Sequence, residues 1–404
     1  MQTLSPPAGA GIAGALPEVS ALPLQAELPD PLRMLDGSTV RSARDWFERR
    51  RPELLRLFEH YMYGYAPAGR VPVEFRIWGQ GTALGGSARW KRVALHITEP
   101  PGVPPIELLL LVPAERAAPR ATFLGLNFQG NHSLVADPVV PEPLCAALGT
   151  HGRVPRGAAA HAWDVERVLS RGYALAAIHT CDVKPDRPKP DEGIQHQLAP
   201  PGAEPDPRAW GTLRAWAWAS SRAVDYLETD PDVGHRPIAV VGHSRLGKAA
   251  MVAAAFDERI ALAIVLQAGC GGSAPSRSSV GESVRNINTG FPHWFSDEFK
   301  KFNAEPARLP FDQHCLAALV APRPLLFANA AEDTWANPMG QFEVLRAAQP
   351  VYELLGAGGL ASPIMPAVGQ LSAGRLGYFL RSGTHSMTAT DWAAFLDFAD
   401  RHVD

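Results

Sequence analysis

One short stretch near the middle of the chain constrains its fold more than any other. Ile238 to Val241 is apolar and rich in β-branched residues, and it stops at Gly242. Ser244 comes two residues later, and the alanine-rich residues after it are typical of a helix. This order predicts a nucleophile elbow, a tight strand-to-helix turn that exposes the serine hydroxyl at the end of a buried strand. The alternative is an ordinary turn whose serine only caps the helix.

The composition is that of a globular protein. With 404 residues, of which 46% are hydrophobic and 20% charged, the chain is long enough for one large α/β domain or two ordinary ones. The net charge is −3 and no basic block interleaves with aromatic residues, so we expect no nucleic-acid partner. No run of 18 apolar residues occurs, so no membrane-spanning helix and no membrane partner are expected.

The four cysteines are widely spaced. They are Cys145, Cys181, Cys270 and Cys315, and none forms a C-x-x-C pair. This spacing predicts neither a metal site nor a disulfide framework. Free, buried cysteines are the expectation, although the sequence leaves one bridge open.

Strand and helix patterns predict one mixed sheet. Glu74 to Trp78, Lys91 to Thr98 and Ile106 to Val112 have strand-like patterns with short turns between them, which predicts antiparallel pairs at one sheet edge. From Ala121 onward, buried strands alternate with helices, which predicts a mostly parallel sheet covered on both faces. The expected fold class is therefore α/β, with ligands bound at the carboxyl ends of the strands.

We expect residues 1–30 to form a flexible or draped N-terminal arm and residues 31–404 to form a single catalytic domain. Residues 41–62 show helical spacing of apolar side chains. Asp182 to Arg208 carries many prolines and charges, and we expect it to be an ordered surface insertion near the site.

A serine nucleophile needs a histidine to accept its proton and an acid to orient that histidine. His385 follows the apolar strand predicted at Tyr378 to Leu380 and precedes the last helix, which is where this fold places its base. The competing histidines downstream of Ser244 are His293, His314 and His402.

The predicted acid is Asp333, at the end of the penultimate strand. Glu332 is adjacent and is the alternative acid, and Asp333 could instead cap the helix that starts near Asn337. The oxyanion donors are expected to be the backbone N–H of Arg245 and a group from the loop Asn127 to His132. The guanidinium of Arg245 could add a charged donor, or form a surface salt bridge.

The stretch Gly242 to Lys248 resembles the G-x-S-R-x-G-K signature of carbohydrate esterase family 15, the glucuronoyl esterases. Other segments resemble the bacterial branch of that family: Phe58 to Gly64, Asn127 to His132, Gly269 to Gly272, Gly281 to Val284, Asn288 to Phe295, Leu309 to His314, Ala321 to Pro324 and Glu332 to Pro338. The resemblance extends from Leu32 to His402.

This resemblance implies a three-layer α/β-hydrolase sandwich, with a mostly parallel central sheet and antiparallel N-terminal edge strands. It also implies cleavage of esters on the carboxyl group of 4-O-methyl-glucuronic acid, which decorates xylan, with an alcohol that belongs to lignin. It implies that Ser244 is the nucleophile, His385 the base and Arg245 the oxyanion-stabilising arginine. Three further residues, Lys248, Glu282 and Trp335, match positions that hold the sugar. No metal or cofactor is implied.

The sequence departs from the family at one position. Many members carry the triad acid as a glutamate on the strand after the elbow, where this chain has Gln267. A glutamine supplies no negative charge, so we expect Asp333 to replace that acid. Two alternative functions remain: another carbohydrate esterase, such as an acetyl xylan esterase, and a carbohydrate-binding homologue without catalysis.

The location of the protein is not determined by its sequence. The first 30 residues contain no Lys or Arg and show no signal peptide, although a polymeric substrate favours a secreted or periplasmic enzyme. We expect a monomer that acts on glucuronoxylan or on lignin–carbohydrate esters.

Overall fold

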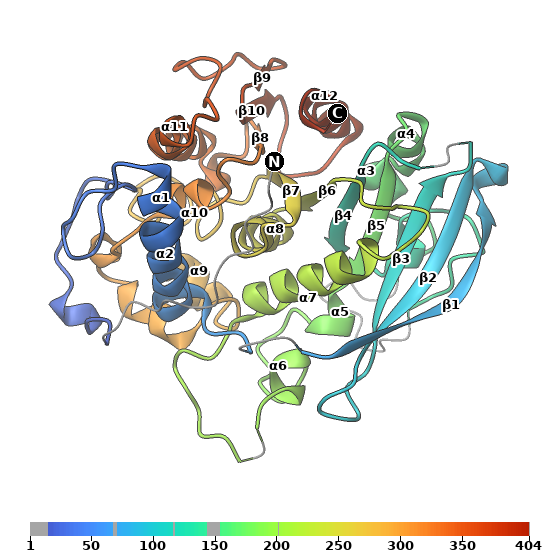
Figure 1. Cartoon of the computed structure of the whole chain (residues 1–404), viewed down its shortest axis with the longest axis horizontal. Coiled ribbons are helices and arrows are strands. Elements are labelled where there is room, and N and C mark those ends of the chain that lie inside the picture. Colours follow the sequence, from blue (N-terminus) through green and yellow to red (C-terminus); the bar gives the residue numbers. More distant parts are fainter. Residues whose placement is uncertain (1–14, 68–70, 116–117, 144–153, 201, 404) are drawn as a thin grey trace.

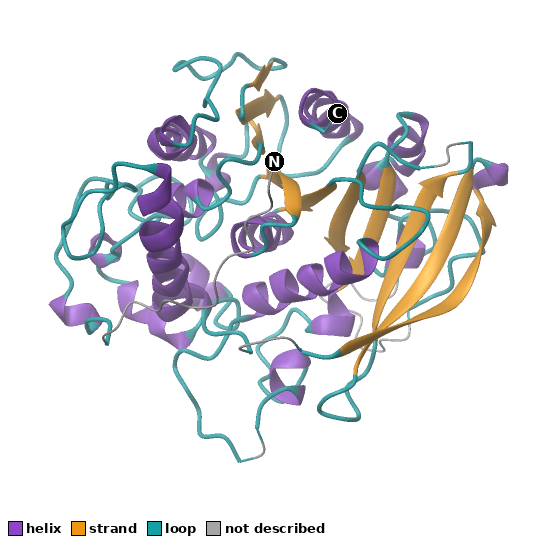
Figure 2. Ribbon diagram, viewed as in Figure 1, coloured by secondary structure: helices purple, strands orange, loops and turns teal. Residues whose placement is uncertain are grey.

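A single mixed sheet organises the molecule. The computed structural model describes residues 15–67, 71–115, 118–143, 154–200 and 202–403. Its ten strands lie in the order β1-β2-β3-β5-β4-β6-β7-β8-β10-β9 (Figure 1). Helices cover both faces of the sheet, as Figure 2 shows in purple against the orange strands. The predicted α/β-hydrolase sandwich is confirmed.

The first three strands form an antiparallel edge, as the sequence predicts. They are β1 (Val73–Ala83), β2 (Ala88–Ile97) and β3 (Ile106–Pro113). Each pairs antiparallel with the next, and β3 pairs antiparallel with β5.

The centre of the sheet is parallel. Its strands are β4 (Thr122–Asn127), β5 (Ala174–His179), β6 (Ile238–His243), β7 (Ile260–Leu266), β8 (Leu325–Ala330) and β10 (Leu376–Arg381), and β9 (Leu371–Ala373) adds an antiparallel edge. Along β6, Ile238 and Val240 face one hydrophobic core while Ala239 and Val241 face the other. Because both faces are covered by apolar side chains, the strands are apolar throughout instead of alternating with polar residues.

The helices divide between these two cores. The larger core is covered by α2 (Arg51–Phe58), α7 (Thr212–Leu227), α8 (Arg245–Phe256), α10 (Gln313–Ala318) and α11 (Pro338–Leu354). The other core is covered by α3 (Ala160–Trp163), α4 (Val165–Ser170) and α12 (Ala389–His402). The remaining α-helices are the short α1 (Ala43–Asp45), α5 (Thr180–Val183), α6 (Ile194–Gln197) and α9 (Val284–Gly290).

The helix expected over residues 41–62 is present but is interrupted by π-helical turns. Such turns occupy Trp46–Arg50 and Glu59–Tyr63, on either side of α2. Trp46, Tyr61 and Tyr63 are fully buried there, so these turns bring large aromatic side chains into the core.

Residues 15–30 lie against the body of the protein. Val19 and Leu22 are buried, and the Tyr61 hydroxyl donates a hydrogen bond to the Pro17 carbonyl at 2.6 Å. His314 Nε2 lies 2.6 Å from the Pro29 carbonyl oxygen. These contacts drape the described part of the arm over helices of the larger core.

The cysteines differ in state. Cys270 and Cys315 are free and buried, as expected. Cys181 is disulfide-bonded, so the expectation of a free thiol is wrong there. Cys145 lies outside the described residues. Within the described ranges, no helix combines the length and the apolar character needed to cross a membrane.

Candidate active site

The predicted nucleophile elbow is present at the carboxyl end of β6. Ser244 has φ 59° and ψ −127°, a strained backbone conformation, and it immediately precedes α8. A Cβ at Gly242 would lie 2.1 Å from the Leu246 carbonyl oxygen, and a Cβ at Gly247 would lie 3.0 Å from that of Gly242. The turn is therefore so tight that only glycine fits at position 242. The second glycine of the common G-x-S-x-G form would stand at position 246, but in this chain it stands at 247.

His385 and Asp333 are brought together at the same edge of the sheet. Strands β8 and β10 are parallel neighbours with Ala330 opposite Arg381, so the loops that follow them lie side by side. His385 Nδ1 lies 2.6 Å from Asp333 Oδ2. The carboxylate is buried while 44% of the histidine side chain is exposed, so the ring is open to solvent and the carboxylate beside it is not.

Glu332 has a different role in this loop. Its Oε1 accepts a hydrogen bond from the Gly383 N–H at 2.9 Å, and its own N–H donates to the Gly383 carbonyl at 3.1 Å. Glu332 therefore braces the histidine loop, residues 382–388 between β10 and α12, by bonding to the backbone of Gly383. The structure gives it no hydrogen bond to the imidazole of His385. Of the two predicted acids, the geometry places Asp333 behind His385.

The other candidate histidines have other partners. His293 Nε2 lies 2.9 Å from Asp186 Oδ1, His314 contacts the backbone of the draped arm, and His402 lies in the last turn of α12. The ring beside the elbow is that of His385, whose centroid lies 4.5 Å from that of His243.

Gln267 organises the histidine loop. Its Oε1 accepts a hydrogen bond from the Ser386 N–H at 3.1 Å, and its Nε2 donates to the Thr384 carbonyl at 3.3 Å. The same Oε1 lies 3.0 Å from His243 Nε2. The glutamine thus fixes the residues on both sides of His385. The sequence showed only that no acid stands at this position. It could not show that Gln267 holds the histidine loop, because the loop residues it bonds lie more than 100 residues further along the chain.

His243 is held neutral beside the elbow. Burial, together with the nearby His385, lowers its pKa to about 3. A neutral ring next to His385 adds no positive charge that would oppose protonation of that imidazole.

Arg245 is fixed by a carboxylate that the sequence did not single out. Its Nη1 lies 2.6 Å from Asp186 Oδ2, and its guanidinium lies over the rings of Phe128, Phe291 and Trp294 at 5.4, 5.1 and 4.8 Å. The predicted insertion Asp182 to Arg208 thus reaches the elbow through Asp186. The sequence pointed to Asp186 only through the expectation that this insertion lies near the site.

The Asp186 carboxylate contacts two further side chains besides Arg245. It accepts a hydrogen bond from Trp294 Nε1 at 2.8 Å as well as the contact with His293 Nε2. Burial opposes its ionisation, but the hydrogen bonds from His293 and Trp294 and the Arg245 charge lower its pKa below the usual value. A buried anion therefore sets the orientation of the Arg245 guanidinium.

The three predicted sugar-binding residues lie together. Lys248 is buried, its Nζ donates to the carbonyls of Ala268 and Cys270 at 2.5 and 2.6 Å, and it lies 3.8 Å from Glu282 Oε2. Burial lowers the Lys248 pKa, with Glu282 opposing that shift. The Glu282 N–H donates to the Trp335 carbonyl at 3.0 Å, and the Trp335 side chain is exposed.

The loop predicted to supply a second oxyanion donor begins beside the elbow. It follows β4, which is the neighbour of β6 in the sheet. Asn127 Nδ2 donates to Asn131 Oδ1 at 2.8 Å, and Gly130 has φ 86°, a conformation that favours glycine. Its role stays a prediction. Among the described residues, no group of three or more His, Cys, Asp or Glu side chains could hold a metal ion.

A strained serine after a central strand, followed along the chain by an acid and then a histidine after later strands, is the arrangement of an α/β-hydrolase. Comparisons with known proteins agree with this class. The family model for fungal glucuronyl esterases matches residues 205–356. A carbohydrate esterase of an unknown prokaryotic organism is 42% identical over 386 residues, which cover 93% of this chain and 89% of that protein.

Solved structures show the same likeness. A promiscuous CE15 esterase from a marine bacterial metagenome is 42% identical, with a TM-score of 0.85 over 95% of this chain and 99% of that one. A glucuronoyl esterase from Solibacter usitatus is 39% identical, with a TM-score of 0.87 over 94% of this chain and 99% of that one. The chain belongs to carbohydrate esterase family 15, the glucuronoyl esterases, and is a carboxylic ester hydrolase.

Proposed function

We propose that this enzyme hydrolyses esters of glucuronic acid and 4-O-methyl-glucuronic acid through an acyl-enzyme on Ser244. The observation that carries the proposal is the 2.6 Å contact between His385 Nδ1 and Asp333 Oδ2 beside the strained elbow. A relative from Schizophyllum commune, 30% identical over 81% of this chain and 74% of its own length, is a 4-O-methyl-glucuronoyl methylesterase.

The first half of the reaction forms the acyl-enzyme. Ser244 Oγ attacks the ester carbonyl while His385 Nε2 accepts its proton, and Asp333 stabilises the resulting imidazolium through Nδ1–H. The backbone N–H and the guanidinium of Arg245 stabilise the negative oxygen of the tetrahedral intermediate. The C–O bond to the alcohol then breaks, and His385 returns the proton to the departing alcohol oxygen.

Water completes the cycle. His385 removes a proton from a water molecule, whose oxygen attacks the acyl carbon and displaces Ser244 Oγ. The serine recovers its proton and the free uronic acid leaves, so one ester and one water yield one acid and one alcohol. No metal or cofactor takes part in this proposal.

The uronic acyl group is held on the β7 and β8 side of the elbow. Lys248 Nζ and Glu282 can bond the sugar hydroxyls, and the exposed ring of Trp335 offers a flat apolar wall for the pyranose face. The natural ester we propose links a glucuronate of xylan to a lignin alcohol.

Ser244→Ala, assayed by product analysis on a benzyl ester of 4-O-methyl-glucuronic acid, tests this function. We expect turnover to fall by at least about 10⁴-fold because the nucleophile is lost. A fluorophosphonate should label the wild type and spare the variant. Ser170→Ala, at an exposed serine closing α4, is the matched control and should behave as wild type. Full turnover by Ser244→Ala would remove Ser244 from the mechanism.

The protein is proposed to act outside the cytoplasm. A polymeric substrate favours export, and the disulfide-bonded state of Cys181 is typical of an oxidising compartment. Fractionation of cells that express the protein natively, with esterase activity found only in the cytoplasm, would contradict this location.

A further inference from the structure

An acidic side chain that the mechanism above does not use lies at the end of β5, close to the loop Asn127 to His132. Asp182 belongs to α5, and only 9% of its side chain is exposed. Its Oδ2 accepts a hydrogen bond from the Glu107 N–H of β3 at 3.2 Å. Its Oδ1 faces His179, the last residue of β5, at 3.9 Å from Nδ1. The carboxyl group therefore lies between two strands of the sheet.

The charged groups around Asp182 have other partners. Glu107 faces it from β3, but Glu107 forms a two-point ion pair with Arg92 of β2, at 3.1 and 2.6 Å. Lys184, two residues further along, directs its ammonium group to backbone carbonyls of the insertion. Helix α7 also packs against α5, and there Trp216 Nε1 donates to the Lys184 carbonyl. Burial, with the Glu107 charge, raises the pKa of Asp182 to about 7.

The contacts of His179 show where its hydrogen lies. Burial, and to a lesser extent the nearby His132, lowers the pKa of His179 to about 4, so the ring is neutral and carries one N–H. Its Nε2 lies 3.2 Å from the Phe128 carbonyl oxygen, which can only accept, so the hydrogen is on Nε2. Nδ1 is therefore an acceptor, and it is buried without a hydrogen-bond partner in the described part of the chain.

The unpartnered Nδ1 calls for a donor, and the group that faces it is the Asp182 carboxyl. An ionised carboxylate would face this acceptor with a lone pair and repel it. In a neutral acid, Oδ2 is the carbonyl oxygen that accepts from Glu107, and Oδ1 carries the hydroxyl hydrogen. The 3.9 Å separation is longer than a hydrogen bond, so the two side chains must approach by about 1 Å to form one.

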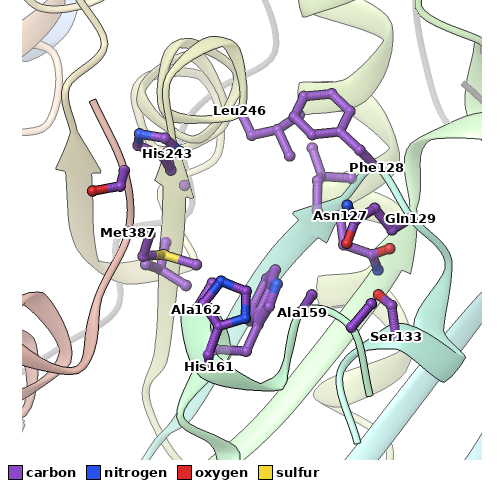
Figure 3. Close-up of a pocket in the computed structure, with 16 residues that line it drawn as sticks. Asn127, Phe128, Gln129, Ser133, Ala159, His161, Ala162, His243, Leu246 and Met387 are labelled. Carbon is purple, nitrogen blue, oxygen red and sulfur yellow. The ribbon is translucent and has the colours of Figure 1, made fainter. Parts of the chain in front are cut away.

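His179 connects this carboxyl group to the active site through Phe128. In a trans peptide the C=O and the following N–H point in opposite directions, so the bond to the Phe128 carbonyl also sets the direction of the Gln129 N–H. The Phe128 ring lies 5.4 Å from the Arg245 guanidinium. Phe128, Gln129 and Leu246 line a pocket of about 270 Å³ beside the elbow (Figure 3). A shift of this peptide would therefore disturb both the oxyanion loop and Arg245.

We propose that Asp182 works as a neutral carboxylic acid, and that Asp182 and His179 are positioning residues for the oxyanion loop. The Asp182 O–H donates to His179 Nδ1, and His179 Nε2–H holds the Phe128 carbonyl. When the pH rises and Asp182 loses this proton to solvent, the first of these bonds breaks and the loop is held less firmly. This inference rests on the proposed function, because positioning is read from ester turnover.

Asp182→Asn tests the proposal through the pH profile, since its amide keeps a donor for Nδ1 at every pH. We expect kcat on benzyl glucuronate to agree within about threefold between the two proteins at about pH 6. At about pH 8.5 the wild type should be about tenfold slower than the variant, with KM nearly unchanged, because a misaligned oxyanion donor lowers kcat. Titration of His385 is common to both proteins and cancels in their ratio. A ratio that does not change with pH would overturn the proposal.

Asp182→Leu removes the donor at similar volume and should lower kcat about 10- to 100-fold below that of Asp182→Asn at about pH 6. Equal kcat in the two variants would overturn the positioning role. Asp191→Asn, exposed on the same insertion, is the matched control and should keep the wild-type pH profile. If Asp182→Leu does not fold, the profile of Asp182→Asn still decides the question.

Infrared difference spectroscopy detects the proton without any turnover. The wild type minus Asp182→Asn should show the carbonyl band of a protonated carboxylic acid at about pH 6, and the band should be lost by about pH 8.5. Absence of this band at about pH 6 would overturn the proposal. A band that titrates as expected, in a protein that does not hydrolyse glucuronate esters, would support the neutral acid and count instead against the proposed function.

Discussion

At the scale of single residues, each proposed catalytic group is held in place by a neighbouring side chain. Asp333 lies behind His385, Glu332 braces the same loop through Gly383, and Gln267 fixes the residues that flank the imidazole. Arg245 is oriented in the same way by Asp186. These supporting groups have different chemistry, so substitutions at them should differ in size of effect.

Asp333→Asn should be far more damaging than Gln267→Ala. Loss of the carboxylate removes the charge that stabilises the imidazolium and should lower kcat by about 10⁴-fold. Gln267→Ala loses hydrogen bonds to the loop but no charge, so we expect a fall of about tenfold. Steady-state kinetics on benzyl glucuronate check both, with Glu332→Gln as the control that keeps an acceptor for Gly383. The opposite ranking would refute Asp333 as the acid.

Asp186→Asn should lower kcat more than it changes KM. The guanidinium of Arg245 would lose the buried anion that orients it, and loss of one oxyanion donor costs about 10²–10³ in kcat, so a misaligned donor should cost about 10- to 100-fold. Arg245→Gln and the double variant complete a cycle, and their effects should be non-additive because both act through one group. Asp206→Asn, exposed on the same insertion, is the control. Fully additive effects would show that Asp186 acts independently of Arg245.

At the scale of elements, the elbow joins β6 to α8 without room for a side chain at its first glycine. A Cβ at Gly242 would meet the Leu246 carbonyl at 2.1 Å, and that carbonyl belongs to the helix backbone and cannot move freely. The tightness of this turn is what lets Ser244 hold its strained conformation.

Gly242→Ala should therefore destabilise the protein by more than about 4 kcal/mol, or prevent folding, because helix and strand must separate. Gly290→Ala is the matched control, since a Cβ there has open space in α9 and alanine favours helix. Urea unfolding followed by circular dichroism measures both. If Gly242→Ala unfolds at the wild-type midpoint, the elbow is looser than described.

At the scale of the whole molecule, the half-buried histidine of the elbow, His243, couples folding to pH. His243 has a pKa of about 3 in the folded protein and about 6.5 when unfolded. Between these values the unfolded chain binds the extra proton, so stability rises with pH and falls on acidification. Burial raises the pKa of Asp182 to about 7, so this group makes the folded protein less stable as the pH rises. The contribution of His243 is therefore measured as the difference in stability between the wild type and a His243 variant.

His243→Gln should make unfolding less sensitive to acid. The wild type should lose about 2 kcal/mol through this one group between pH 7 and pH 5, and the variant should lack that loss. Glutamine keeps a donor for Gln267 Oε1, so the cost at pH 7 should be small. Urea midpoints at both pH values give the difference, and parallel declines in the two proteins would show that His243 titrates normally.

The sequence alone determined the elements and the chemical groups at their ends. The apolar run before Gly242, and the strands that precede Asp333 and His385, are local patterns, so a nucleophile, an acid and a base could be predicted from short segments. The parallel sheet followed from the alternation of strands and helices. The family signature around Ser244 then indicated the kind of ester.

The tertiary structure alone decided which of these groups meet. Asp186 is 59 residues from Arg245 and Gln267 is 119 residues from Ser386, and no local pattern records such pairs. Adjacent Asp333 and Glu332 are equivalent along the chain, but only one faces the imidazole once β8 and β10 lie side by side. The same holds for the pocket beside the elbow, because its walls come from β4, α3, β6 and the histidine loop. Strand order sets these distances, and strand order is fixed by packing of the whole chain.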